Sequence, residues 1–316
     1  MNNFTTFSAK FEREFEQERS RRLARHADLL SGRVSVSDDL AALHQDGLLL
    51  KPSLLNRSSL LAVGARVDDF VRRLDCLGRL RHHRLELEQE RLGIATGQIF
   101  LDPAKITSEE HLAQECSNVS IRDPYLNLPE IIDLTLDPAI IRVASDYFGC
   151  VPVLSYVKVI KTFAGGIDAA DTQFYHRDSG SYWILKAFIY LNDVDTNGGP
   201  FCYARRSHAA TRGGSQFPDS IYARFDDADV AEMFGRNNVI ECVGSVGDVW
   251  FAETIGMHKG KRPDTVPRRI IILTFCVEKE KGFAYNPIKI RASDLARLSP
   301  LQRAVCDELA VVEETQ

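Results

Sequence analysis

Residues 181–194 have the sequence SYWILKAFIYLNDV, a run of aromatic and aliphatic residues that ends near the turn-forming pair Asn192-Asp193. Short runs of this composition, bounded by Gly, Pro, Asn or Asp, are typical of β-strands. Five further runs of the same kind lie nearby, at residues 151–163, 200–206, 237–243, 247–253 and 268–277. We therefore predict that residues 150–280 form an antiparallel, all-β core.

Helical periodicity replaces the strand pattern on both sides of this core. The amino-terminal segment has the apolar spacing of an amphipathic helix from about residue 8 to residue 31. Pro138 and Gly149 are typical of the beginning and the end of another helix, and residues 293–310 predict one more in the tail. The predicted fold class is mainly β with flanking α-helices: a barrel-like double sheet that helices cover on one face.

Length and composition favour one globular unit. The chain has 316 residues, of which 44% are hydrophobic and 26% are charged, so there is enough apolar material for a buried core. We expect a single domain over residues 1–316. Within it, residues 1–149 should be mostly helical, residues 150–280 should form the β core, and residues 281–316 should form a helical tail.

The charge balance and the apolar pattern exclude some kinds of partner. A formal net charge of -5 gives no general attraction to nucleic acid or to an anionic membrane surface. No run approaches the length of a membrane span, and the amino terminus lacks the apolar stretch of a secretion signal, so we expect a cytoplasmic protein. The seven cysteines lie far apart in the sequence, and we expect them to be reduced.

The segment TQFYHRDSG, residues 172–180, contains the first candidate site. In an extended segment His176 and Asp178 leave the backbone on one face and can bind the same ion, whereas Arg177 points away. A third ligand must come from elsewhere, and His258 in the sequence MHKG is the candidate. Two histidines and one carboxylate leave positions open on the metal, as suits Fe(II). The alternative is a pair of residues that cap a turn, together with an ordinary loop histidine.

The order of the surrounding motifs carries a resemblance to a known family. After the His-Arg-Asp motif come a strand with the sequence LNDV at its end, an Asn-Gly-Gly-Pro turn with a Ser-His end, a Gly-Asp-Val-Trp strand, a distal histidine and a basic strand. These motifs lie at residues 176–178, 183–194, 197–208, 247–250, 258 and 266–275. In this order they resemble the phytanoyl-CoA dioxygenase family. The segment QDGLLLKPSLL is also similar to that family, so the resemblance extends from about residue 37 to residue 280.

The resemblance implies a double-stranded β-helix (jelly roll, cupin-like), with Fe(II) as the metal and with 2-oxoglutarate and O2 as co-substrates. It assigns His176, Asp178 and His258 to the metal, and it places Phe188 against the co-substrate, although an ordinary core aromatic explains Phe188 equally well. Arg269, eleven residues after His258, would hold the far carboxylate of 2-oxoglutarate, since arginine binds a carboxylate in bidentate geometry. Arg268 would then point outward, because neighbours on a strand leave on opposite faces. The same parity would turn the side chains of 271 and 273 inward.

Several features depart from the family pattern or stay open. Arg205 and Arg206 occupy the turn where the family has Pro-Gly, and they predict either contacts to an anionic substrate or an exposed, solvated turn. Gly260 replaces a hydroxyl residue that often contacts 2-oxoglutarate. Lys158 is expected to point outward from an edge strand, although the family sometimes has a polar contact to 2-oxoglutarate there. Residues 211–240 form either a lid over the substrate or a passive insertion.

These features predict an enzyme that hydroxylates an aliphatic C–H bond of a small molecule and releases succinate and CO2. The same chemistry can instead lead to desaturation, epimerisation or cyclisation. An alternative from another class is a catalytically silent jelly-roll protein that binds a ligand without turnover. The intact metal ligands and the arginine favour the enzyme.

Overall fold

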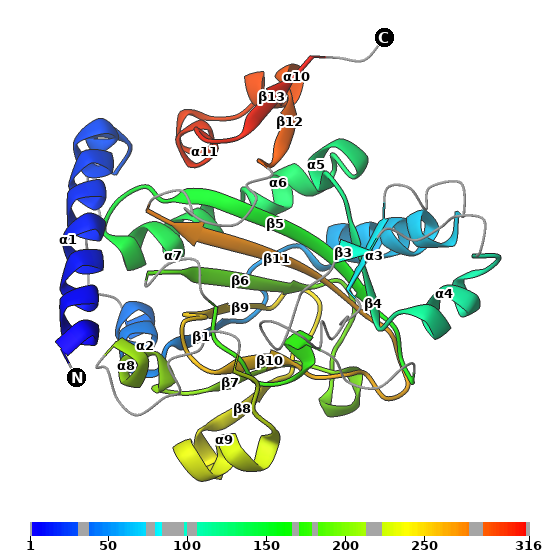
Figure 1. Cartoon of the computed structure of the whole chain (residues 1–316). Helices are drawn as coiled ribbons and strands as arrows, with labels where there is room; N and C mark the ends of the chain where they lie inside the picture. Colours follow the sequence, from blue (N-terminus) through cyan, green and yellow to red (C-terminus); the bar gives the residue numbers. More distant parts are fainter. Residues whose placement is uncertain are drawn as a thin grey trace.

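Figure 1 shows the chain as a computed structural model. The residues that it describes are 2–30, 38–73, 80–83, 98–99, 106–165, 171–178, 183–212, 223–277 and 287–313. Among these residues, no helix combines the length and the apolar character that crossing a membrane requires. The described part of the chain combines antiparallel sheets with flanking helices, as predicted, but its helices contain more residues than its strands, so the fold is mixed rather than mainly β.

Eight strands form the largest of the three sheets in the described part of the chain. Their order is β1-β9-β6-β11-β5-β4-β2-β3, and every registered pair is antiparallel. The central strand β11 lies between β5 and β6. Its residues are registered opposite residues of both strands. The bounds are β1 (Leu48–Lys51), β2 (Leu80–His83), β3 (Gln98–Ile99), β4 (Asn118–Ile121), β5 (Val153–Thr162), β6 (Leu185–Tyr190), β9 (Val249–Ala252) and β11 (Arg268–Cys276).

A smaller sheet packs against one face of this large sheet. It has the order β10-β7-β8, with β7 (Phe201–Ala204) between β10 (His258–Gly260) and β8 (Val239–Cys242). Aromatic and aliphatic side chains from both sheets fill the space between them and form what we call the interior core. Its members include Phe188, Tyr190, Phe201, Tyr203 and Ile270. We call the side of β5, β6 and β11 that carries these residues the interior face.

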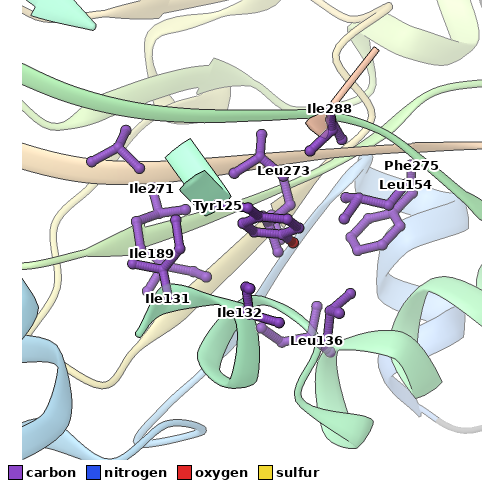
Figure 2. Packing of buried hydrophobic residues seen from close by; sticks show 14 of the residues in the cluster. Tyr125, Ile131, Ile132, Leu136, Leu154, Ile189, Ile271, Leu273, Phe275 and Ile288 are labelled. Atoms are coloured by element: carbon purple, nitrogen blue, oxygen red, sulfur yellow. The ribbon is translucent and has the colours of Figure 1, made fainter. Parts of the chain in front are cut away.

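Helices cover the opposite face of the large sheet. Figure 2 shows Ile189, Ile271 and Leu273 of this face packed with Tyr125, Ile131 and Ile132 of the helices. This helix-covered core is larger than the interior core and takes residues from α3, α5, α6 and α7. The helices are α1 (Asn2–Arg25), α2 (Asp38–Asp46), α3 (Arg57–Arg72), α4 (Glu109–Glu115), α5 (Pro124–Asn127), α6 (Ile131–Thr135), α7 (Pro138–Phe148), α8 (Ser207–Arg212), α9 (Asp227–Phe234), α10 (Ala292–Ala296) and α11 (Pro300–Val305).

Helix α7 begins and ends where its sequence predicts. The Asp137 carboxylate accepts a hydrogen bond from the Ala139 N–H at 2.8 Å, and Pro138 occupies the first turn, where no N–H is needed. Gly149 follows the helix with a φ of 65°, a left-handed conformation that glycine adopts without strain. Local sequence signals are sufficient here because each acts on its own turn.

Short strands accompany the helices on both sides of the β core. The part before residue 150 is not only helical, because β1 to β4 extend the large sheet on both of its sides. The tail is not one helix: it forms α10 and α11 together with a parallel pair, β12 (Lys289–Arg291) and β13 (Ala310–Val312). These strands have three or four residues, or two in β3, so they are too short to show a periodic pattern in the sequence.

Candidate metal centre

Two histidines and one aspartate meet where the segment before β6 passes β10. His176 and His258 exchange backbone hydrogen bonds at 2.9 and 3.0 Å, and the Asp178 N–H donates to the Thr254 carbonyl at 2.9 Å. Ligand atoms of the three side chains lie within 4.8 Å of one another. The structure therefore brings together the three residues that the sequence singles out. No other set of three His, Cys, Asp or Glu residues is placed in this way in the described part of the chain.

Each imidazole is oriented by a backbone carbonyl two residues before it. The Nδ1 of His176 lies 2.9 Å from the Phe174 carbonyl oxygen, and the Nδ1 of His258 lies 2.8 Å from that of Gly256. A carbonyl only accepts hydrogen bonds, so Nδ1 carries the proton in both rings. The lone pair is then on Nε2, the atom that each ring has available for a metal.

Burial keeps both imidazoles neutral. It lowers the pKa of His258 to about 3, and the neighbouring His176 adds to this effect. Burial also lowers the pKa of His176. A metal binds the neutral imidazole, so the site needs no deprotonation of either ring at pH 7.

Asp178 is ionised in spite of its burial. Burial alone would raise its pKa, but the electrostatic interactions with Lys186, His258 and His176 together outweigh burial and hold the pKa of Asp178 below its usual range. The Lys186 Nζ lies 2.5 Å from the Asp178 Oδ2, and the His258 Nε2 lies 3.7 Å from the same oxygen. Two neutral imidazoles and one carboxylate are a donor set that fits Fe(II) and leaves positions for other ligands.

The prediction that Arg269 enters the space between the sheets is wrong. Arg268 continues the row of Ile270 and Ile272, which pack in or against the interior core, whereas Ile271 belongs to the helix-covered core. Arg269 accordingly lies on the helix-covered face, where its Nη1 pairs with the Asp68 carboxylate and its Nε lies 3.3 Å from the Asn192 Oδ1. The number of residues between His258 and the inward arginine is one fewer than the family pattern gives. A shift of one residue moves the side chain to the opposite face of the sheet.

Arg268 is the inward arginine, and it is surrounded by carbonyl and hydroxyl oxygens. Its guanidinium donates to the carbonyl oxygens of Gly199 and Lys261 and to the Thr162 Oγ1, the last two at 3.2 Å. Its side chain is buried and forms no ion pair with a described carboxylate, and its Nε has no hydrogen-bond partner among these residues. Burial lowers the pKa of Arg268. A buried guanidinium of this kind is stabilised by an anionic ligand.

Two glycines shape the surroundings of this arginine. Gly199 has a φ of 69°, and a Cβ there would lie 2.5 Å from the Pro263 nitrogen, so only glycine lets its carbonyl face Arg268. A Cβ at Gly260 would lie 3.2 Å from an Arg268 Nη atom. Glycine in place of the family's hydroxyl residue therefore leaves the guanidinium uncrowded.

Phe188 lies on the interior face. Its ring stacks on Phe201 with centroids 3.8 Å apart, and the Phe201 ring lies 5.7 Å from the ring of His258. The aromatic pair thus borders the metal centre. Lys186, two residues before Phe188, shares its face and reaches Asp178. Sequence reasoning gave Lys186 no role, although its alternation with Phe188 was visible.

Lys158 is neither outward nor on an edge strand. Strand β5 lies between β11 and β4, and Lys158 is registered opposite Ile272, which faces the interior core. β5 is not an edge strand because β4, β2 and β3, which come from the amino-terminal part, continue the sheet beyond it.

The altered turn and its histidine have local partners. Arg206 Nε lies 3.1 Å from the Asp46 Oδ1, and Arg205 Nη1 lies 3.6 Å from the Asp46 Oδ2, so one carboxylate serves both arginines. The His208 Nε2 lies 3.2 Å from the His44 carbonyl oxygen, so this histidine bonds to backbone. Of the 211–240 segment, residues 213–222 lie outside the described residues, and α9 follows them.

Comparison with known proteins shows the fold. No family model matches the chain, and no curated protein shows significant sequence similarity to it. SnoK, a non-haem alpha-ketoglutarate-dependent carbocyclase from nogalamycin biosynthesis, is 17% identical with a TM-score of 0.51, over 84% of this chain and 92% of that one. SnoN, an epimerase also from nogalamycin biosynthesis, is 17% identical with a TM-score of 0.50, over 78% and 87%.

A third similar structure comes from another source. AviO1 from Streptomyces viridochromogenes Tue57 is 15% identical with a TM-score of 0.50, over 81% of this chain and 99% of that one. SnoN has also been solved with Fe3+ and alpha-ketoglutarate bound. The chain therefore has the fold of non-haem alpha-ketoglutarate-dependent enzymes.

Proposed function

We propose that this protein is a non-haem Fe(II) oxygenase that uses 2-oxoglutarate and O2 as co-substrates and oxidises a small molecule. The observation that carries the proposal is the metal centre, in which His176, Asp178 and His258 place their ligand atoms within 4.8 Å of one another. Both rings are held in the tautomer that presents Nε2. The fold shared with SnoK and SnoN supports the same class.

The protein's own residues would hold, orient and shield the reacting groups. When bound, Fe(II) supplies the redox chemistry that couples decarboxylation of 2-oxoglutarate to oxidation of a C–H bond, with succinate and CO2 as products. The backbone carbonyls of Phe174 and Gly256 fix the two histidine rings. The stacked rings of Phe188 and Phe201 border the site with apolar surface, which excludes water from that side.

Arg268 is the residue that would bind the far carboxylate of 2-oxoglutarate. It is buried on the interior face and lies beside Gly260, two residues beyond His258 on β10. Its Nε has no partner among the described residues, and a carboxylate would satisfy that donor and compensate the buried charge. Phe188, on the same face, would line the path between metal and arginine.

The reaction that we propose is hydroxylation of an aliphatic C–H bond. Epimerisation or cyclisation is the second candidate, because SnoN is an epimerase and SnoK a carbocyclase on the same fold. The motif order supports placing the chain with the phytanoyl-CoA dioxygenase family. Strands from both sides of residue 150 share the large sheet, and this supports a single jelly-roll domain.

Metal content and succinate formation test the proposal. Purified protein should bind about one Fe(II) and should release succinate slowly from 2-oxoglutarate under air. Single replacement of His176, Asp178 or His258 by Ala should abolish both. His111→Ala, which changes a half-buried histidine on α4, is the matched control and should retain both. A His258→Ala protein with full iron content and full succinate formation would contradict the assignment of the metal centre.

A further inference from the structure

The interior face carries more positive charge than the proposed reaction uses. On this face of β5, β6 and β11 the residues are Tyr156, Lys158, Ile160, Thr162, Lys186, Phe188, Tyr190, Arg268, Ile270, Ile272 and Thr274. Three of them are cations and none is a carboxylate. Asp178 reaches this face from the segment before β6 and pairs with Lys186. Fe(II) and the 2-oxoglutarate dianion cancel each other's charge. The excess positive charge of the three cationic side chains over Asp178 therefore remains after both are bound.

The cations are separated along the strands, and Lys158 shares its row of the sheet with Phe188, whose ring stacks on Phe201 beside His258. Arg268 is at the start of β11, whereas Lys158 is opposite Ile272, four residues or roughly 13 Å further along the sheet. Lys186 is opposite Thr274, still further from Arg268. Lys186 reaches the metal ligand Asp178, and Arg268 borders Gly260 on the strand of His258, so the metal ligands lie between these two cations.

Lys158 has no acidic partner among the described residues. Its Nζ lies 5.1 Å from the centre of the Tyr156 ring, a cation–π contact within its own strand. Lys158, Tyr156 and Ile272 are all half-buried, so this end of the interior face is accessible to a ligand. An ammonium group that is partly removed from water without a counter-charge costs stability, and an anionic ligand would offset that cost.

We propose that Lys158, in the same row of the sheet as Phe188 and away from Arg268, binds an anionic group of the substrate, a carboxylate or a phosphate, beside the metal centre. Lys186, on the next strand but one, adds its positive charge to this subsite. This inference rests on the proposed function, because it names the substrate class of the proposed oxygenase. The oxidised C–H bond would then lie between the anionic group and the metal.

Phosphorus NMR of inorganic phosphate tests this subsite directly, with 2-oxoglutarate present at saturation so that Arg268 is occupied. In the metal-free protein, wild type should broaden the phosphate resonance saturably, and Lys158→Met should weaken the apparent affinity about tenfold. Lys158→Arg should keep the affinity close to that of wild type because it keeps the charge. Lys289→Met on β12, far from the site, is the control and should bind as wild type does.

A second arm locates the anion and separates its two sources. With Mn2+ at the metal centre, bound phosphate should show paramagnetic relaxation that Lys158→Met removes. Labelled acetate replaces phosphate in a parallel titration. The anion that binds more tightly identifies the anionic group of the substrate as a carboxylate or a phosphate. Equal phosphate binding by wild type and Lys158→Met, or loss of 2-oxoglutarate affinity as the main effect of Lys158→Met, would overturn the proposal. Absence of Mn2+ uptake would instead contradict the proposed function, because the metal-free titration still decides the anion subsite.

Discussion

The two faces of β5, β6 and β11 differ in whether their cationic side chains are paired with carboxylates of the protein. On the helix-covered face, Lys161 pairs with Asp68 at 2.8 Å and with Glu109, and Arg269 pairs with the same Asp68. Each cation there has a carboxylate from a helix. On the interior face, Lys158 and Arg268 have no described carboxylate partner, and Lys186 pairs with a proposed metal ligand.

This difference separates stability from function within one set of strands. On the helix-covered face, the cations are paired with carboxylates of the protein and lie beside the large apolar core. No unpaired cation among the described residues of this face is therefore available to bind a ligand. The interior face has fewer apolar residues and leaves cations to be compensated by bound anions. Substitutions on the first face should therefore lower stability, and substitutions on the second should change binding.

The largest expected effect is on packing. Leu273 is fully buried in the helix-covered core, so Leu273→Ala should lower the free energy of unfolding by about 2–5 kcal/mol. Ile272, its half-buried neighbour on the other face, should cost clearly less when changed to Ala, because it loses fewer contacts. Urea unfolding of both variants measures this. Equal losses would mean that the two faces do not differ in packing.

The next effect compares two lysines on β5. Lys161→Met leaves Asp68 and Glu109 without their shared ammonium group and should lower the free energy of unfolding by about 2–3 kcal/mol. Lys158→Met removes an uncompensated cation and should change it by less than about 0.5 kcal/mol. Thermal or urea unfolding at low ionic strength gives both values. A larger loss in Lys158→Met would show that its charge is compensated inside the protein.

The third comparison concerns the two neighbouring arginines. Arg268→Met should raise the KM for 2-oxoglutarate at least about tenfold, equivalent to about 1.4 kcal/mol, because the far carboxylate loses its partner. Arg269→Met should leave this KM near its wild-type value, since its guanidinium pairs with Asp68 on the other face. Steady-state succinate formation measures both. The reverse order of the two variants would contradict the register of β11.

The smallest effect is the response of the metal-free protein to pH. The pKa of His258 is about 3 when folded and 6.5 when unfolded, so the unfolded state binds more protons between these values. Stability is therefore lost as the pH falls below 6.5. Between pH 7 and pH 6 this histidine should account for a loss of about 0.7 kcal/mol. Urea unfolding at both pH values should show a smaller loss in His258→Gln, and an unchanged loss would exclude this histidine as its source.

Local patterns in the sequence determined much of the protein. The alternation of apolar residues indicated the β core, and Asp137, Pro138 and Gly149 indicated the bounds of α7. The two-residue spacing in the His-Arg-Asp motif placed His176 and Asp178 together, because neighbouring residues of an extended chain alternate faces. Each of these signals depends on interactions within a few residues, which the sequence contains.

Tertiary structure decided what depends on register and on the order of strands. Arg268 rather than Arg269 faces the interior because the pairing of β11 with β5 and β6 fixes its parity, and a count from His258 carries no information on the loop between them. Lys158 shares the interior face because it is registered opposite Ile272, and β5 is not an edge strand because β4 pairs with its residues 160–162. Such pairings join residues far apart in the chain, and their energy lies in contacts that no local pattern records.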